Sequence, residues 1–268
     1  METSILGCGW LGHSLGKHLV KKGHLVKGST TTEEKLYELE KSGINPYRVV
    51  LNPVYSGDKD FLNSDLVVIN IPPPKGSGEI ESFMASQLDS VLSIMRNFSV
   101  GHVIFVSSTS VYPALNREVY ETDAREPERE AGRALLKAER MIMDDSSFAS
   151  TIIRFGGLFG YDRIPGRFLA GKKGLKNGEA PVNLIHRDDC IEIISRIIQQ
   201  DVWGEVFNAC ADMHPTRKEF YTRAAEKAGL PLPVFDESAE LTYKIVNSDK
   251  LKSTINYQFH YPDPMEAI

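Results

Sequence analysis

Apolar and polar residues follow two different periods along this chain, and the two periods alternate. Short runs of consecutive apolar residues are typical of strands buried on both faces of a sheet, and apolar residues spaced by three or four are typical of helices. The runs predict strands at 4–7, 24–28, 47–51, 65–71, 102–106, 151–155, 182–185 and 205–209. The spaced patterns predict helices at 11–22, 80–98, 127–145, 187–200 and 216–228, and another that begins near residue 32.

This alternation predicts the fold class. Strands that are each followed by a helix form a parallel sheet with helices on both faces, an α/β fold with a doubly wound sheet. Glycine, proline and basic residues become frequent after residue 160, and the last forty residues show no clear period. We therefore expect a main domain made of residues 1–155 and 182–210, and a small C-terminal substrate lobe made of residues 156–181 and 211–268.

Three glycines follow the first predicted strand. Gly7, Gly9 and Gly12 have the spacing Gly-x-Gly-x-x-Gly, with Trp10 and Leu11 between the last two. The first glycine lets the chain turn sharply, the second lets the backbone approach a diphosphate, and the third lets the helix pack closely on the strand. The N–H groups at the start of the helix attract the anion. The loop predicts a dinucleotide site in a Rossmann-type sheet, and the alternative is a tight turn without a ligand.

The tip of the second strand bears on the choice of coenzyme. It carries Ser29, Thr30 and Thr31 and no acidic residue. A carboxylate there would bind the ribose hydroxyls of NAD, whereas hydroxyls with Lys27 or Lys35 nearby tolerate the additional phosphate of NADP. NADP is therefore favoured over NAD. The alternative is that Ser29 and Thr30 only cap the next helix.

Composition and charge exclude several classes of protein. The 268 residues have a formal net charge of -5, without the clustered basic side chains that bind nucleic acid. We find no apolar run near 20 residues and no signal peptide, so membrane insertion and secretion are not expected.

Cys8, Cys190 and Cys210 lie far apart without metal-ligand spacing. We expect a reduced, cytoplasmic protein with no metal site; a redox role for Cys8 is the minority alternative.

Longer motifs resemble a known superfamily. They are the glycine loop, the strand end at 107–112, the turn at 154–157 and the stretch 182–189. Together they are similar to the extended short-chain dehydrogenase/reductase superfamily, of the NAD-dependent epimerase/dehydratase type, and most closely to its atypical YeeZ-like branch. The likeness covers nearly the whole chain. It implies coenzyme contacts at the ends of the later strands, which are provided by Ile71, Pro72, Ser107, Phe155 and Gly156.

The resemblance also reveals what this chain lacks. Active members of the superfamily place a tyrosine, and a lysine four residues later, at the start of one helix, where the tyrosine moves a proton and the lysine lowers its pKa. The matching positions here hold Ala131 and Leu135. Neither side chain can exchange a proton.

Other residues are candidates for the missing chemistry. Ser108 matches the catalytic serine or threonine of the superfamily, and it either orients a ligand or is only a polar residue at a strand end. A general acid could come from Tyr112, Tyr120, His186 or His214. Each of these four also has a simpler explanation, as a packing residue, a satisfied histidine or a loop residue.

Two arginines lie where the substrate lobe of the superfamily faces the coenzyme. Arg163 and Arg167 have guanidinium groups suited to phosphate or carboxylate, so with His186 they predict an anionic small-molecule substrate, such as a nucleotide sugar or a small acid. The alternative is structural ion pairing, for example with Asp162.

Two functions follow from these features. One is an NAD(P)-binding oxidoreductase or epimerase/dehydratase-like enzyme of atypical mechanism, and the other is a catalytically silent sensor of the coenzyme's redox state. The superfamily also commonly forms homodimers through the helices that correspond to 80–98 and 132–145 here.

Overall fold

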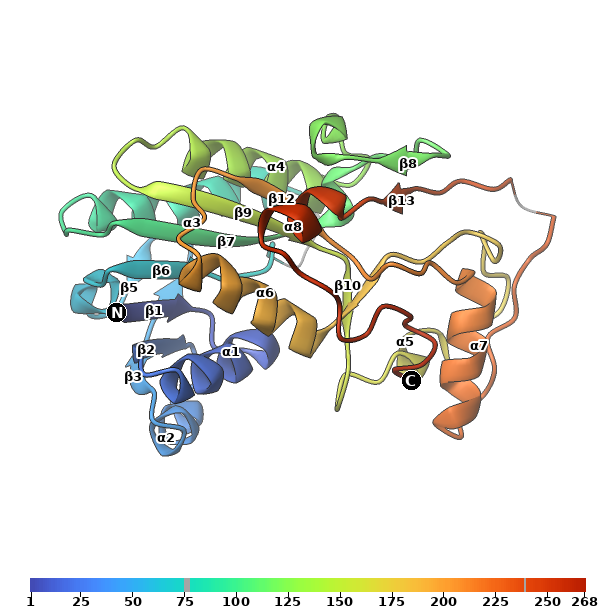
Figure 1. The fold of residues 1–268 in the computed structure, drawn as a ribbon, viewed down its shortest axis with the longest axis horizontal. Helices are drawn as coiled ribbons and strands as arrows, with labels where there is room; N and C mark the ends of the chain where they lie inside the picture. Colours follow the sequence, from blue (N-terminus) through green and yellow to red (C-terminus); the bar gives the residue numbers. More distant parts are fainter. Residues whose placement is uncertain (75–77, 239) are drawn as a thin grey trace.

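A seven-stranded parallel sheet forms the centre of the computed structural model, which describes residues 1–74, 78–238 and 240–268 (Figure 1). The strand order is β12-β9-β7-β6-β1-β2-β3. These strands are β1 (Glu2–Leu6), β2 (Leu25–Thr30), β3 (Asn45–Arg48), β6 (Leu66–Ile69), β7 (His102–Ser108), β9 (Ala149–Phe155) and β12 (Val206–Ala209). The central strand β6 is fully buried, as its unbroken apolar run predicts.

Helices cover both faces of the sheet. One face packs against α1 (Trp10–Lys21), α2 (Glu34–Lys41) and α6 (Arg187–Gln199), and the other against α3 (Ile80–Met95) and α4 (Glu130–Met143). The two layers bury separate apolar clusters on either side of the strands. The predicted fold class, a doubly wound Rossmann-type sheet, is confirmed. In the part of the chain that the structure describes, no helix has the length and apolar character needed to cross a membrane.

The remaining elements are short and lie mainly around the carboxyl edge of the sheet and beyond it. They are β4 (Val50–Leu51), β5 (Tyr55–Ser56), β8 (Glu118–Val119), β10 (Gly157–Phe159), β11 (Leu184–His186), β13 (Ile245–Val246), α5 (Gly166–Leu169), α7 (Arg217–Lys227), α8 (Asp249–Thr254), and the 3-10 helices η1 (Lys59–Leu62), η2 (Thr109–Val111) and η3 (Glu121–Asp123). The single strand predicted at 47–51 is divided into β3 and β4, because β4 leaves the sheet and pairs with β5 in an antiparallel hairpin.

The last segment of the chain packs differently from the expectation. Leu251 on α8, together with Ile255, Tyr257 and Phe259, lies in the apolar cluster that contains α6. The buried Asp189 carboxylate on α6 accepts a hydrogen bond of 2.6 Å from the Tyr257 hydroxyl. Residues 251–259 therefore belong to the core of the main sheet, although their weak periodicity had placed them in the lobe.

The helices expected to form a homodimer, α3 and α4, pack against each other. Their apolar side chains join the same buried cluster inside the chain. Their outward side chains are largely polar, and include Ser82, Ser86, Asp89, Arg133, Lys137 and Arg140. A homodimer through these two helices stays a prediction.

The order of the strands creates a crevice between β1 and β6. From β1 the chain continues outward to β2 and β3, whereas from β6 it continues in the opposite direction to β7, β9 and β12. The loops at the carboxyl ends of β1 and β6 therefore lead away from each other. In doubly wound sheets this reversal point is where ligands bind.

Candidate functional site: a dinucleotide cleft

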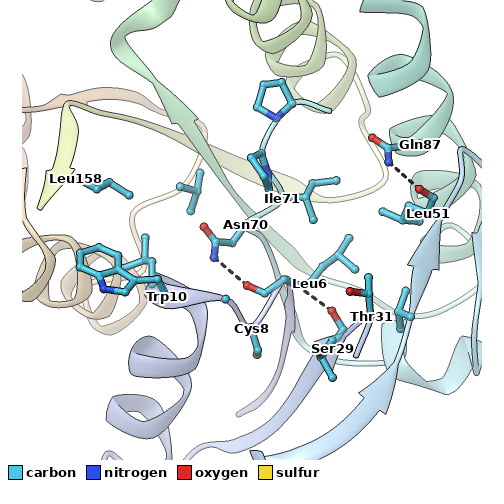
Figure 2. A pocket seen from close by; sticks show the side chains of 18 of the residues that line it. Leu6, Cys8, Trp10, Ser29, Thr31, Leu51, Asn70, Ile71, Gln87 and Leu158 are labelled. Atoms are coloured by element: carbon cyan, nitrogen blue, oxygen red, sulfur yellow. Dashed lines mark hydrogen bonds between the residues drawn. The ribbon is translucent and has the colours of Figure 1, made fainter. Parts of the chain in front are cut away.

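A cavity of about 590 Å³ opens at this crevice (Figure 2). Its wall includes most of the residues predicted to bind coenzyme or substrate, namely Gly7, Gly9, Trp10, Leu11, Ser29, Thr30, Thr31, Ile71, Pro72, Ser107, Ser108 and Arg163. Residues from the ends of β1, β2, β6 and β7 and from the start of α1 thus meet at one place, as the parallel topology predicts.

The glycine loop has the geometry that a diphosphate requires. Gly7 has a φ of +103°, and a Cβ there would lie 2.5 Å from the Asn70 carbonyl oxygen. A Cβ on Gly12 would lie 2.3 Å from the Gly7 oxygen, so Gly12 acts by letting α1 approach the loop rather than by lining the cavity. A Cβ on Gly9 would meet no atom within 4 Å. The space beside Gly9 is therefore open to a ligand.

The start of α1 is equipped for an anion. No side chain caps it, and its first turn contains no acidic residue. Two neighbours hold the loop in place: the Gly7 N–H donates to the Ser29 hydroxyl over 2.8 Å, and the Asn70 amide donates to the Gly7 carbonyl over 2.9 Å. The N–H groups at the helix start are thus left available to a diphosphate. Asn70 was missed as a site residue because, in sequence, it belongs to an apolar strand.

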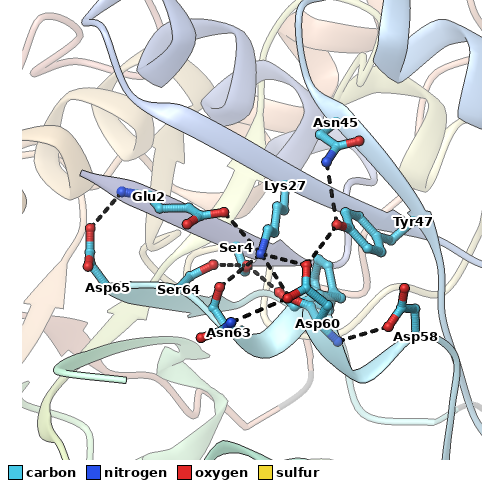
Figure 3. Close-up of polar contacts among 11 residues, drawn as sticks. Glu2, Ser4, Lys27, Asn45, Tyr47, Asp58, Asp60, Asn63, Ser64 and Asp65 are labelled. Atoms are coloured by element: carbon cyan, nitrogen blue, oxygen red, sulfur yellow. Dashed lines mark hydrogen bonds and ion pairs between the residues drawn. The ribbon is translucent and has the colours of Figure 1, made fainter. Parts of the chain in front are cut away.

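The structure corrects one of the two lysines that were expected beside the coenzyme phosphate at the tip of β2. Lys27 is buried, and its ammonium lies 3.0 Å from Glu2 and 3.2 Å from Asp60 (Figure 3). It lies three residues before the strand tip, outside the cavity wall, and cannot approach a coenzyme phosphate. Lys35 is exposed and does line the cavity.

Hydroxyls at the tip of β2 do not cap the next helix. The Thr30 hydroxyl accepts from the Thr32 N–H over 3.2 Å, one turn before α2 begins. The N-cap of α2 is Glu33, without a side-chain cap bond. Thr31 and Thr32 are both exposed in the cavity wall, where their hydroxyls can meet a ligand.

The other end of the cavity holds two serines and a leucine. Ser107, Ser108 and Leu135 all line the wall. Leu135 is the residue that the resemblance sets at the superfamily's lysine, and its apolar side chain forms part of this wall. The Ser108 hydroxyl accepts from the Ser110 N–H over 3.2 Å, which leaves its own proton free to donate.

A buried ion pair lies directly behind Ser107. The Ser107 hydroxyl donates to Glu139, and Arg154 donates to the same carboxylate through two nitrogens, at 2.6 Å and 3.1 Å. The side chains of Glu139 and Arg154 are 4% and 6% exposed. Because the carboxylate fixes the Ser107 proton, the Ser107 oxygen is presented to the cavity as a hydrogen-bond acceptor.

Tyr112 belongs to the same buried network and does not reach the cavity. Its hydroxyl donates to Asn208 over 2.6 Å and accepts from Arg154 over 2.7 Å. Burial raises the pKa of its phenol well above the usual range. Tyr112 is a structural residue, and its assignment as a catalytic residue is corrected.

The other proton donors considered also lie outside the cavity wall. His186 is buried against Phe159 and Tyr261, and burial lowers its pKa, so it is a neutral packing residue. His214 bonds the Val182 carbonyl and Tyr120 bonds Glu118. The substrate-binding role predicted for His186 is therefore not supported.

Three further predicted residues lie apart from the cavity. Phe155 is 1% exposed in the sheet core, and a Cβ on Gly156 would lie 2.7 Å from the Cys210 sulfur, so both serve packing. Arg167 on α5 is exposed and does not line the wall. A sequence motif locates these residues along the chain but does not fix which side of the backbone meets the ligand.

A cluster of charged and aromatic side chains links the glycine loop to the lobe. The Trp10 indole N–H donates to Asp162 over 2.8 Å. The guanidinium groups of Arg163 and Arg187 lie 5.4 Å and 4.8 Å from the centre of the Trp10 ring. Of the two, Arg163 lines the cavity and is exposed, so it can reach an anion there.

Cys8 lies inside the glycine loop but is chemically protected. It is 6% exposed, and burial raises the pKa of its thiol to about 12. The thiol is therefore protonated at pH 8. We expect iodoacetamide at pH 8 to modify Cys8 at least about a hundredfold more slowly in the native protein than in urea, measured by mass spectrometry of the tryptic peptide. A native rate close to the unfolded rate would contradict this expectation and would favour a redox role.

The fold and the cleft define a Rossmann-type dinucleotide-binding protein, and comparison with known sequences agrees. The family profile described as NAD(P)H-binding matches residues 7–201, and Protein YeeZ of Escherichia coli K12 is 33% identical over 269 residues, covering 98% of this chain and 97% of YeeZ. The chain belongs to this NAD(P)H-binding family and is a relative of YeeZ over nearly its whole length.

Solved structures share the fold at lower identity. A protein from Methylobacillus flagellatus, named as a candidate NAD-dependent epimerase/dehydratase, is 23% identical with a TM-score of 0.74, covering 99% of this chain and 95% of that one. UDP-glucuronic acid 4-epimerase from Bacillus cereus, solved with UDP-glucuronic acid and NAD, is 18% identical with a TM-score of 0.80, covering 100% and 97%. At these identities the likeness concerns the fold alone.

Proposed function

We propose that this protein is an NAD(P)-dependent oxidoreductase or epimerase/dehydratase-like enzyme that acts on an anionic small molecule without the usual tyrosine and lysine. The observation that carries the proposal is the uncapped start of α1, which faces an open cavity beside Gly9. The nicotinamide, when bound, supplies hydride transfer. The protein then has to bind and orient the substrate and to exclude water, and the residues of the cavity are suited to those tasks.

The serine end of the cavity is where the substrate would lie. Ser108 can donate its proton to a substrate oxygen, while Ser107, fixed by Glu139, can accept from a hydroxyl or an amide. Leu135 contributes an apolar wall that excludes water. In this arrangement the two serines hold a carbonyl or hydroxyl carbon in position, and no side chain of the cavity wall replaces the tyrosine as a strong proton donor.

An anionic substrate is supported by Arg163. Its guanidinium is exposed, lines the cavity and rests on Trp10, whose side chain is itself anchored to Asp162. The structural relative from Bacillus cereus was solved with an anionic sugar nucleotide. We therefore infer that a carboxylate or phosphate of the substrate binds Arg163, within the reducing cytoplasmic environment that its three free, buried cysteines favour.

The test is turnover. Purified protein is given NADPH or NADH with a panel of aldehydes, ketones, keto acids and nucleotide sugars, and the nicotinamide absorbance at 340 nm is followed; net epimerisation is followed by chromatography. We expect at least one anionic compound to turn over and Ser108→Ala to slow it without changing coenzyme affinity. If the coenzyme binds tightly but no compound reacts, the result favours the alternative, a redox sensor, which the presence of Ala131 and Leu135 supports.

The coenzyme we propose is NADP rather than NAD. The tip of β2 has hydroxyls, no carboxylate and one exposed ammonium, that of Lys35, in the cavity wall. We expect tighter binding of NADPH than of NADH by calorimetry, and about a five- to tenfold loss of NADPH affinity in Lys35→Gln with NADH unchanged. The control is Lys41→Gln, at the other end of the same helix. Tighter binding of NADH by the unaltered protein would contradict the preference.

A further inference from the structure

A tight turn of the lobe reaches the glycine loop. Residues 160–163 follow β10, and the Arg163 N–H closes the turn on the Gly160 carbonyl over 3.1 Å. Gly160 and Tyr161 have φ values of +120° and +52°, so two successive residues lie in the left-handed region. A side chain as large as that of tyrosine rarely adopts this conformation, which persists only where neighbouring groups hold it. Specific contacts therefore hold the turn in place.

The two central residues of the turn make these contacts. The Tyr161 hydroxyl donates to the Asp188 carboxylate over 2.7 Å, and the Tyr161 ring lies 4.2 Å from the Arg187 guanidinium, both in the first turn of α6. The Asp162 carboxylate accepts from the Trp10 indole N–H over 2.8 Å, at the start of α1. The turn thus connects the start of α6 with the start of α1.

The contact between Asp162 and Trp10 is the more easily broken of the two. The Arg187 side chain, which lies against the rings of Tyr161 and Trp10, is only 16% exposed, whereas the Asp162 side chain is 78% exposed. A hydrogen bond to an exposed carboxylate is weak, because water competes for both partners. This bond can therefore break and re-form while Tyr161 stays attached to α6.

The same contact joins two walls of the cavity. Trp10 comes from the glycine loop, while Leu158 and Arg163 come from the lobe side, and all three line the cavity. Figure 2 shows Trp10 and Leu158 at one end of it and Thr31 at the other. Trp10 is also the first residue of α1, where the diphosphate of a coenzyme would lie. The bond to Asp162 thus ties the lobe to the residue that begins the diphosphate site.

We propose that the bond between Trp10 and Asp162 is a latch that controls how fast the coenzyme enters and leaves the cleft. This inference rests on the proposed function, because the diphosphate at the start of α1 is what brings the coenzyme next to the latch. With the latch closed, the turn holds the lobe against the glycine loop and the dinucleotide is retained. With the latch open, the two walls can separate and the dinucleotide can pass.

A latch of this kind affects both directions of binding. Association and dissociation both need the open state, so a change that populates this state raises the two rate constants by the same factor. The dissociation constant, which is their ratio, then stays the same. A residue that only contacts the bound coenzyme would behave differently, because its loss raises the dissociation rate and the dissociation constant together.

The experiment measures both rate constants for NADPH by stopped-flow nicotinamide fluorescence, with dissociation followed by displacement with excess NADP. Asp162→Ala removes the acceptor, and we expect both rate constants to rise about fivefold, as the loss of one exposed hydrogen bond implies. The dissociation constant should change less than about twofold. Asp162→Asn keeps an acceptor oxygen and should restore rates close to those of the unaltered protein. Asp236→Ala, at another exposed carboxylate of the lobe, is the matched control and should change neither rate.

Trp10→Phe removes the donor of the same bond and keeps an aromatic ring, so it should raise both rates even if Asp162→Ala does not fold. Unchanged rates in both variants would overturn the inference alone, and so would a rise confined to dissociation, which would make Asp162 a contact of the bound coenzyme. If the unaltered protein binds neither NADPH nor NADH, the proposed function fails, and the latch with it.

Discussion

Replacing Gly9 with valine is expected to lower the affinity for NADPH at least about a hundredfold while the protein stays folded. The added side chain would occupy the open space beside the start of α1 and displace the diphosphate from the N–H groups, each of which contributes about 1.5–3 kcal/mol as a hydrogen bond to a charged group. A Cβ on Gly9 meets no protein atom within 4 Å, so the fold has room for the added side chain.

Calorimetry with NADPH and thermal unfolding measured by circular dichroism test both parts of this expectation. The matched control is Gly101→Val, where a Cβ would make an ordinary contact of 3.6 Å with the Asp65 oxygen, far from the cavity. The control should bind coenzyme as the unaltered protein does. If Gly9→Val kept its affinity while remaining folded, the diphosphate would not lie on the glycine loop, and the proposed function would lose its basis.

The second large effect concerns stability. Arg154→Met should destabilise the protein by about 3–5 kcal/mol, because it leaves the Glu139 carboxylate buried without its partner. For a chain of this size the midpoint of thermal unfolding should fall by roughly 10 °C. Glu139→Met should have a similar cost, since it strands the Arg154 guanidinium and removes the acceptor of Ser107.

A double-variant cycle shows whether the pair itself is responsible. Glu139→Met with Arg154→Met removes both charges and should recover part of the loss, because no unpaired charge remains buried. Lys137→Met is the control on the same helix: its exposed pair with Glu81 is expected to contribute no more than about 1 kcal/mol. Strictly additive losses at Glu139 and Arg154 would contradict the interpretation of these residues as a coupled pair.

The parts of the site that sequence alone predicted are those built within one short segment. Gly7, Gly9 and Gly12 lie in one strand–loop–helix unit, from the end of β1 to the first turn of α1, so their spacing along the chain fixes their spacing in space. The sheet was predictable for a related reason: periods of two kinds, repeated along the chain, allow few arrangements other than parallel strands covered by helices. The NAD(P)H-binding family also followed from local motifs.

What only the tertiary structure decided is the direction of individual side chains and the partners brought from distant segments. Lys27 and Lys35 are both near one strand tip in sequence, yet Lys27 is bound by Glu2 and Asp60 while Lys35 faces the cavity. Tyr112 is a second example, because its hydroxyl is already paired with Asn208 and Arg154, which lie far away in the chain. The physical reason is that a backbone pattern sets which element a residue belongs to, whereas the packing of neighbouring elements determines whether its polar atoms are already paired or remain available to a ligand.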